Sequence, residues 1–204
     1  MVLSRWISYL FHPILMPTLG LALILSLDSY LKFTVQPAMK IYLYIILVVN
    51  TIVFPILILG LLKFRGVIKS FHLSERKDRL IPFGVTCIFY GFSYNIMQKS
   101  ALPPIVLSVF LGMTLSVFLT FALTFFTKIS VHMVGVSGVL GAVIALYMKF
   151  AADYRIEIAA LVLLWGLIGF ARLHLKAHNL PQIIIGTLVG FASVFSITLV
   201  GVMI

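Results

Sequence analysis

The chain has 204 residues, of which 62% are hydrophobic and 10% are charged, and its formal net charge is +10. Soluble domains have about 45–50% apolar and about 25% charged residues, so this composition excludes a water-soluble globule. The basic residues stand in short segments between long apolar runs, without an aromatic stacking platform, so we also expect no nucleic-acid partner.

Long apolar runs, taken in chain order, predict an all-α, polytopic transmembrane helix bundle with six to seven spanning helices. A helical crossing needs about 20 predominantly apolar residues. The runs that approach this length are 11–27, 41–62, 81–98, 102–126, 133–150, 157–171 and 181–203. We interpret the first run as an uncleaved anchor, because no small-residue cleavage site precedes Asp28. One integral membrane domain, residues 1–204, is expected, with 1–62 as its leading helices.

Counting crossings from the amino terminus brings three loops to one face of the membrane: 63–80, 127–132 and 172–180. All five histidines and most of the Lys and Arg residues fall on that face. The positive-inside rule would place the face in the cytoplasm. Cations that hold an anionic substrate carry no information about insertion, however, so both orientations stay open.

The loop at 172–180 carries the densest set of reactive side chains. Asn179 is a reasonable helix cap and Pro181 suits a first turn, which predicts that the last helix begins here. Gln182 then lies about one turn beyond His178, where its side-chain carbonyl can orient the imidazole. Arg172 stands at the end of the preceding apolar run.

The other two loops add further cations. Arg76 and Arg79 are three residues apart and can project together just before a helix starts. Lys128 and His132 are four apart and share a face if this stretch is helical. The three loops thus bring guanidinium, ammonium and imidazole groups to one face.

Each of these residues also has an ordinary structural explanation. Juxtamembrane Arg and Lys side chains commonly anchor helices. Ser137 and Gly138 either pack helices closely or expose backbone N–H groups to an anion. Taken together, the set suits a phosphate group, which Arg binds with two hydrogen bonds. We therefore expect anionic lipid headgroups or a phosphate substrate as the partner.

The order and spacing of these fragments resemble the type 2 phosphatidic acid phosphatase superfamily, membrane enzymes that remove phosphate from lipids. The family's third motif has Ser-Arg, five residues, His, three residues and Asp. Arg172 and His178 match it, and Gln182 replaces the Asp. In the middle motif, Pro-Ser-Gly-His, this chain keeps Ser and Gly and has Val139 in place of His.

The resemblance implies a phosphatase-like core over residues 75–204, a bacterial inner membrane, and hydrolysis that needs no metal and no cofactor. It implies that His178 is the nucleophile, oriented by Gln182, and that His132, one or two turns before Val139, is the nearest candidate for the missing proton donor. Arg76 and Arg79 lie in the region of the first motif but out of its register. The residues expected to bind phosphate are Arg172, Arg76, Arg79, Lys128, Ser137 and Gly138.

Three functions stay open. The first is hydrolysis of a polyprenyl or glycerophospholipid phosphate or diphosphate through a phosphohistidine. The second, motivated by Gln182 and Val139, is a catalytically impaired relative that binds or carries lipid phosphate. The third is a structural membrane protein with basic anchors.

Metal chemistry fits the sequence less well. Hard metals that support phosphoryl transfer need clustered carboxylates, and the loops of this face contain only Glu75 and Asp78. A zinc site built from His132, His174 and His178 is the remaining metal alternative.

Overall fold

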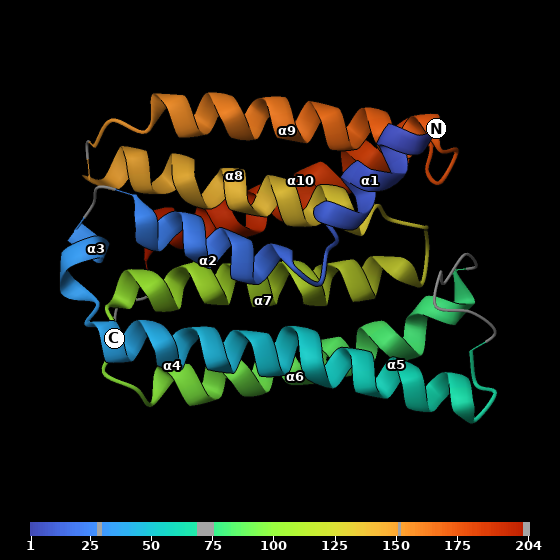
Figure 1. The fold of residues 1–204 in the computed structure, drawn as a ribbon, viewed down its shortest axis with the longest axis horizontal. Helices are drawn as coiled ribbons and strands as arrows, with labels where there is room; N and C mark the ends of the chain where they lie inside the picture. The colour runs from blue at the N-terminus through green and yellow to red at the C-terminus, as the bar shows by residue number, and fades with distance from the viewer. Residues whose placement is uncertain (28–29, 69–75, 151, 202–204) are drawn as a thin grey trace.

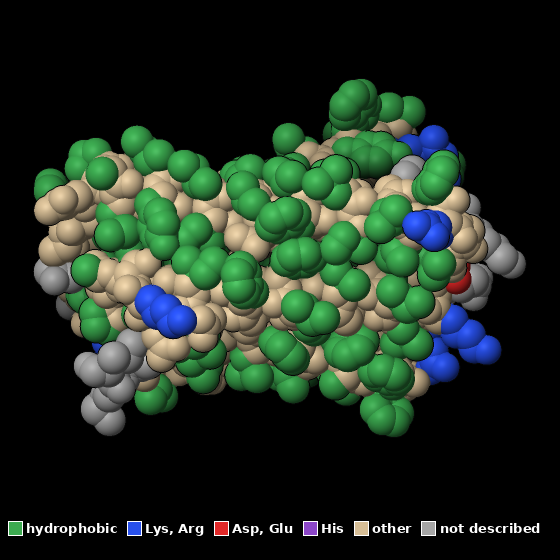
Figure 2. All heavy atoms as spheres, turned by 90° about the horizontal axis from the view of Figure 1, so that it is seen from below, with side chains coloured by type: hydrophobic (Ala, Val, Ile, Leu, Met, Phe, Trp, Pro, Cys, Tyr) green, Lys and Arg blue, Asp and Glu red, His purple; other side chains and the backbone are tan. Residues whose placement is uncertain are grey.

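The computed structural model describes residues 1–27, 30–68, 76–150 and 152–201, and all regular structure in these ranges is helical (Figure 1). Six segments of the described chain are long and apolar enough to cross a membrane: Pro37–Phe64, Lys77–Gln98, Pro104–Thr124, Val131–Phe150, Arg155–His174 and Leu180–Val200. Figure 2 shows hydrophobic side chains over the middle of one face, with Lys and Arg towards its two ends. The predicted all-α polytopic bundle is confirmed.

One predicted crossing does not form. The apolar run at 11–27 folds as α2 (Met16–Ser26), an 11-residue helix that follows a turn. At 1.5 Å per residue it spans about 16 Å, against about 30 Å of bilayer hydrocarbon. Pro13 lies in the turn and Pro17 in the first turn of α2, so the prolines divide the run. The run from 157 does form a helix long and apolar enough to cross, α9 (Arg155–His174).

The first helix, α1 (Val2–Leu10), lies against α9 with its polar side turned inward. Ser4 and Ser8 are buried. Apart from Arg5, the exposed side chains are apolar or aromatic: Val2, Leu3, Trp6, Tyr9 and Leu10. This distribution is typical of a helix whose outer face contacts lipid.

The longest crossing contains a π-helical segment. It is built from α4 (Pro37–Leu47), η1 (Val48–Val53) and α5 (Phe54–Phe64). Pro55 has no backbone N–H to donate to the carbonyl four residues earlier. The π turn accommodates this missing helical hydrogen bond. Side chains bond two carbonyls beside it: Asn50 Nδ2 donates to Ile46 (2.9 Å) and Thr51 Oγ1 to Leu47 (2.7 Å).

The core of the bundle is formed by α7 (Pro104–Thr124), α8 (Val131–Phe150) and α10 (Leu180–Val200), with the most extensive contact between α8 and α10. Glycines bring these backbones together. A Cβ added at Gly190 would overlap the carbonyl oxygen of Val134 and the hydroxyl of Ser137. One added at Gly186 would lie 2.7 Å from the Ser130 carbonyl oxygen.

The described parts of the three loops expected on one face lie together at one end of the bundle, beside the amino terminus (Figure 1). They connect α5 to α6 (Leu80–Gln98), α7 to α8, and α9 to α10. His72 and Glu75, also expected there, lie outside the described residues. Two short segments complete the chain: α3 (Tyr30–Thr34) and the 3-10 turn η2 (Lys77–Arg79).

Candidate functional site

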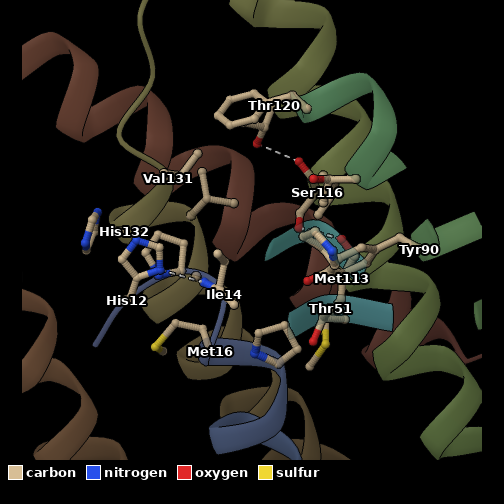
Figure 3. A pocket seen from close by; sticks show the side chains of 18 of the residues that line it. His12, Ile14, Met16, Thr51, Tyr90, Met113, Ser116, Thr120, Val131 and His132 are labelled. Carbon is tan, nitrogen blue, oxygen red and sulfur yellow. Dashed lines mark hydrogen bonds between the residues drawn. The ribbon is translucent and has the colours of Figure 1, made fainter. Parts of the chain in front are cut away.

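A cavity of about 260 Å³ extends from the loop end into the bundle. Its basic lining residues come from that end: His12, Arg79, His132, Arg172 and His178. Most of the remaining lining is apolar and includes Met16, Phe83, Met113 and Val139. In Figure 3, His12 and His132 lie on one side of the cavity, with Thr51 and Tyr90 on the other. The cavity therefore combines a basic end with an apolar interior.

Local backbone geometry explains how Arg172 and His178 reach the same cavity. At the end of α9, Lys176 N–H donates to the Leu173 carbonyl (2.9 Å) and Ala177 N–H donates to the Arg172 carbonyl (3.1 Å). Lys176 has a left-handed conformation, with φ of 50°. This pair of bonds is the Schellman motif that ends many helices. The motif reverses the chain. Arg172 in the last turn of α9 and His178, just before the Asn179 cap of α10, therefore face the same cavity.

The start of α10 fixes the tautomer of His178. Asn179 and Gln182 form a capping box, in which Gln182 Oε1 accepts from Asn179 N–H (3.4 Å). Because a backbone N–H can only donate, the amide oxygen of Gln182 must face it. The same oxygen lies 2.9 Å from His178 Nδ1, which must therefore carry the hydrogen. The predicted contact between Gln182 and His178 is confirmed, and Nε2 keeps a free lone pair without a hydrogen-bond partner among the described residues.

The surroundings of His178 also favour its neutral form. The pKa of His178 is lowered to about 4, mainly by burial and also by the charges of Arg79, Arg172 and Lys128, while the hydrogen bond to Gln182 opposes the shift. At neutral pH the imidazole is therefore uncharged, which is the form that acts as a nucleophile.

Two guanidinium groups lie beside His178. Arg79 is only 8% exposed, and its Nη1 donates to the Ile129 carbonyl (3.2 Å). Arg172 Nη1 donates to Ser8 Oγ (3.2 Å), whereas its Nε is buried and finds no acceptor in the described part of the chain. The described residues that line the cavity include no Asp or Glu. A buried cationic donor without an acceptor is suited to an anion.

Arg76 and Lys128 occupy other places. Arg76 does not project with Arg79, because its Nη1 donates to the Phe125 carbonyl (2.8 Å) at the end of α7. A cation at a helix carboxyl end is stabilised by the helix dipole. Lys128 lies in the loop before α8, so it does not share a helical face with His132. Neither side chain lines the cavity, although the charge of Lys128 acts on His178.

Ser137 and Gly138 pack helices. Ser137 is fully buried against Gly190, and a Cβ at Gly138 would lie 3.2 Å from Val194 on α10. Gly138 also lines the cavity. It lies beyond the first turn of α8, however, where backbone N–H groups are already bonded within the helix. The positions of Ser137 and Gly138 therefore support a role in helix packing. They give no support to phosphate binding by the backbone N–H groups of these residues.

His132 reaches the cavity, but its N–H group is already used. Its Nε2 lies 3.1 Å from the Ser8 carbonyl, which can only accept, so Nε2 carries the hydrogen. Nδ1 is buried and has no hydrogen-bond partner among the described residues. His132 therefore ties α8 to α1, while its ring meets that of His12 edge-on at 5.7 Å between centroids.

Two residues without a predicted role, Ser8 and His12, also belong to this site. Ser8 holds His132 through its carbonyl and Arg172 through its hydroxyl. His12 lines the cavity beside them. Two signals were available: His12 was counted on the same face as the other histidines, and Ser4 and Ser8 lie four residues apart, on one face of a mostly apolar helix.

The proposed zinc alternative finds no support in the arrangement of the histidines. Among the described residues, no group of three His, Cys, Asp or Glu side chains could hold a metal ion. His174 is exposed and stacks on Phe170, with 5.6 Å between ring centroids.

Comparisons of the chain with family models, curated proteins and solved structures gave no match. The resemblance to the phosphatase superfamily therefore rests on the motifs described above.

Proposed function

We propose that this chain is a membrane phosphatase that hydrolyses a lipid phosphate or diphosphate through a phosphohistidine at His178, without a metal. The observation that carries the proposal is the state of His178. Its Nδ1–H is donated to Gln182, its Nε2 lone pair has no hydrogen-bond partner in the described part of the chain, and it shares a cavity with Arg79 and Arg172. A nucleophile aimed at phosphorus needs that lone pair, and the phosphoryl oxygens need such donors.

The rest of the cavity supports a lipid as the substrate. The basic residues belong to the loop end of the bundle, and the mostly apolar lining continues between the crossings to Met113 and Val139. A phosphorylated lipid has a charged phosphate, which would face the basic end, followed by a hydrocarbon chain, which would face the apolar lining. Polyprenyl and glycerophospholipid phosphates both fit this description, and the phosphatase resemblance favours a bacterial inner membrane as the location.

In the proposed reaction, His178 Nε2 attacks phosphorus while the bond from phosphorus to the lipid oxygen breaks, and the departing lipid oxygen takes a proton from water. The ring becomes positively charged, and the Gln182 carbonyl stabilises it through Nδ1–H. Water then attacks phosphorus and loses a proton to solvent, the electron pair of the broken N–P bond returns to Nε2, and hydrogen phosphate leaves a neutral ring. A Gln carbonyl keeps the hydrogen bond of a carboxylate but lacks its charge. Losing the corresponding carboxylate in a serine protease triad costs about 10⁴ in rate, so we expect slow turnover.

Gln182 and Val139 favour a second candidate function. These two residues stand where the resembling family has the carboxylate and the proton donor. A chain that lacks both could bind or carry lipid phosphate through Arg79 and Arg172 without hydrolysing it.

Phosphate release by detergent-purified full-length protein tests the proposal. The substrates are phosphatidic acid, farnesyl phosphate and farnesyl diphosphate, each with and without EDTA. We expect release that survives EDTA and falls by at least about 10³-fold in His178→Ala, with unchanged thermal unfolding. His174→Ala, at an exposed histidine of the same end, is the matched control. Wild-type release by His178→Ala would contradict the proposal. Saturable binding without release, weakened by Arg172→Ala, would favour the carrier.

A further inference from the structure

The turn between α1 and α2 brings His12 to the basic end of the cavity. His12 is half-buried, lines the cavity with Arg172 and His178, and packs edge-on against His132 (Figure 3). It belongs to neither the phosphatase-like core at 75–204 nor any motif identified in the sequence.

A backbone hydrogen bond fixes which nitrogen of His12 carries the proton. Ile14 N–H donates to His12 Nδ1 (3.3 Å). Nδ1 must then hold a lone pair, and the neutral ring carries its hydrogen on Nε2. Protonation of Nδ1 would set two N–H groups against each other, so this bond favours the neutral ring. Burial and then the charge of Arg172 lower the pKa of His12, which acts in the same direction.

The Nε2–H of His12 is a donor without an acceptor in the described part of the chain. Close by, the Nε of Arg172 is a second such donor, and it is buried. His132 does not compete for a ligand, because its own N–H is donated to the Ser8 carbonyl. Two donors that lack acceptors at the basic end of one cavity are the arrangement that an oxyanion would complete.

We propose that His12 is a ligand of the substrate phosphate and donates Nε2–H from a neutral imidazole to a phosphoryl oxygen. The inference rests on the proposed function and extends its site to the amino-terminal segment. A neutral donor stays in place during both attack by His178 and attack by water, because it transfers no proton. It also adds no charge to a site that already holds two guanidinium groups.

Two substitutions separate a ligand from a structural residue. His12→Gln places an amide N–H near the position of Nε2 but loses the acceptor for Ile14 N–H. His12→Asn keeps an acceptor near the position of Nδ1 but loses the Nε2–H donor. The measurements are turnover of dioctanoyl phosphatidic acid, thermal unfolding in detergent and calorimetric titration with inorganic phosphate. His174→Asn is the matched control, since His174 is exposed and outside the cavity.

We expect His12→Asn to lower kcat/KM by about 10²-fold, the usual effect of removing one oxyanion donor, and His12→Gln to retain most of the activity. The opposite order would overturn the inference, because it would assign His12 to holding the turn. A third outcome would also overturn the inference, in favour of a proton donor: both variants lose activity with phosphatidic acid but keep it with p-nitrophenyl phosphate, which has a good leaving group.

If the wild type releases no phosphate, the proposed hydrolase fails. The phosphate titration then decides: weaker binding by His12→Asn than by His12→Gln supports the ligand, and equal binding contradicts it.

Discussion

Helices α8 and α10 meet backbone to backbone, with Gly190 against the Val134 carbonyl and the Ser137 hydroxyl. The amino-terminal segment meets the site differently. Helix α1 packs on α9, Ser8 contacts His132 and Arg172 through one hydrogen bond each, and the His12 ring meets that of His132. The α8–α10 contact leaves no space for a larger side chain at Gly190. The amino-terminal segment contributes polar groups to the site through few contacts. We infer that the α8–α10 contact governs stability and that the amino-terminal segment tunes the chemistry.

The largest effect should come from breaking the α8–α10 contact. In Gly190→Val the added atoms meet backbone and a buried hydroxyl, which cannot move aside, so the helices must separate. Overpacking of this kind costs about 1–3 kcal/mol or more, and we expect aggregated protein or a strongly lowered unfolding temperature in detergent. Gly166→Val on α9 is the control, because a Cβ there meets nothing within 4 Å. Equal unfolding temperatures for the two variants would contradict this account.

The next effect separates chemistry from stability. Arg172→Lys keeps the positive charge but loses the planar fork that donates to Ser8 and leaves Nε for an anion. We expect kcat/KM to fall by about 10²-fold with little change in unfolding temperature. Arg155→Lys, at the opposite end and paired with Asp153, should keep wild-type activity. Unchanged kcat/KM in Arg172→Lys would remove Arg172 from the phosphate site.

A smaller effect, an increase in kcat, is expected for Gln182→Glu. Glu suits the same capping-box position and adds a negative charge beside Nδ1 of His178. The charge stabilises the positive ring that forms on attack, and we expect kcat to rise about tenfold, or about 1.4 kcal/mol. Activity of the wild type should fall only as the pH drops through the His178 pKa of about 4. The added anion favours the protonated ring, so this fall should move to higher pH in the variant. A pH profile identical to that of the wild type would contradict the assignment.

The smallest effect should come from Ser8→Ala. It removes the 3.2 Å hydrogen bond to Arg172 Nη1 but leaves the Ser8 carbonyl that accepts from His132. The donor is a charged guanidinium, but Arg172 lines the cavity, where water can replace the lost hydroxyl, so we expect only a severalfold loss of kcat/KM. Ser4→Ala, one turn earlier on the same buried stripe, is the matched control. An equal effect in both variants would assign Ser8 to packing alone.

Features set by neighbouring residues were predictable from the sequence. Asn179, Pro181 and Gln182 define the start of α10 through local capping, so the contact between Gln182 and His178 followed from their spacing. The crossings followed from hydropathy, apart from the run at 11–27. In that run the mean hydropathy is high, but it does not depend on where Pro13 and Pro17 interrupt the helix.

Features set by distant contacts were not predictable. Arg76 and Arg79 are close in sequence but separate because the carbonyls of Phe125 and Ile129, about 50 residues away, accept from them individually. Ser8 bonds His132 and Arg172 across 124 and 164 residues. No local pattern encodes such pairings, since they depend on how α1 packs against α9.

Trapping the covalent intermediate is the most direct test of the central claim. Full-length protein is mixed with phosphatidic acid labelled on its phosphate, quenched in alkali, in which phosphohistidine survives, and digested for mass spectrometry. We predict a phosphoryl group on His178 that is absent from His178→Ala and that decays as free phosphate appears. Turnover that proceeds without label on His178, or with label on another residue, would contradict the account.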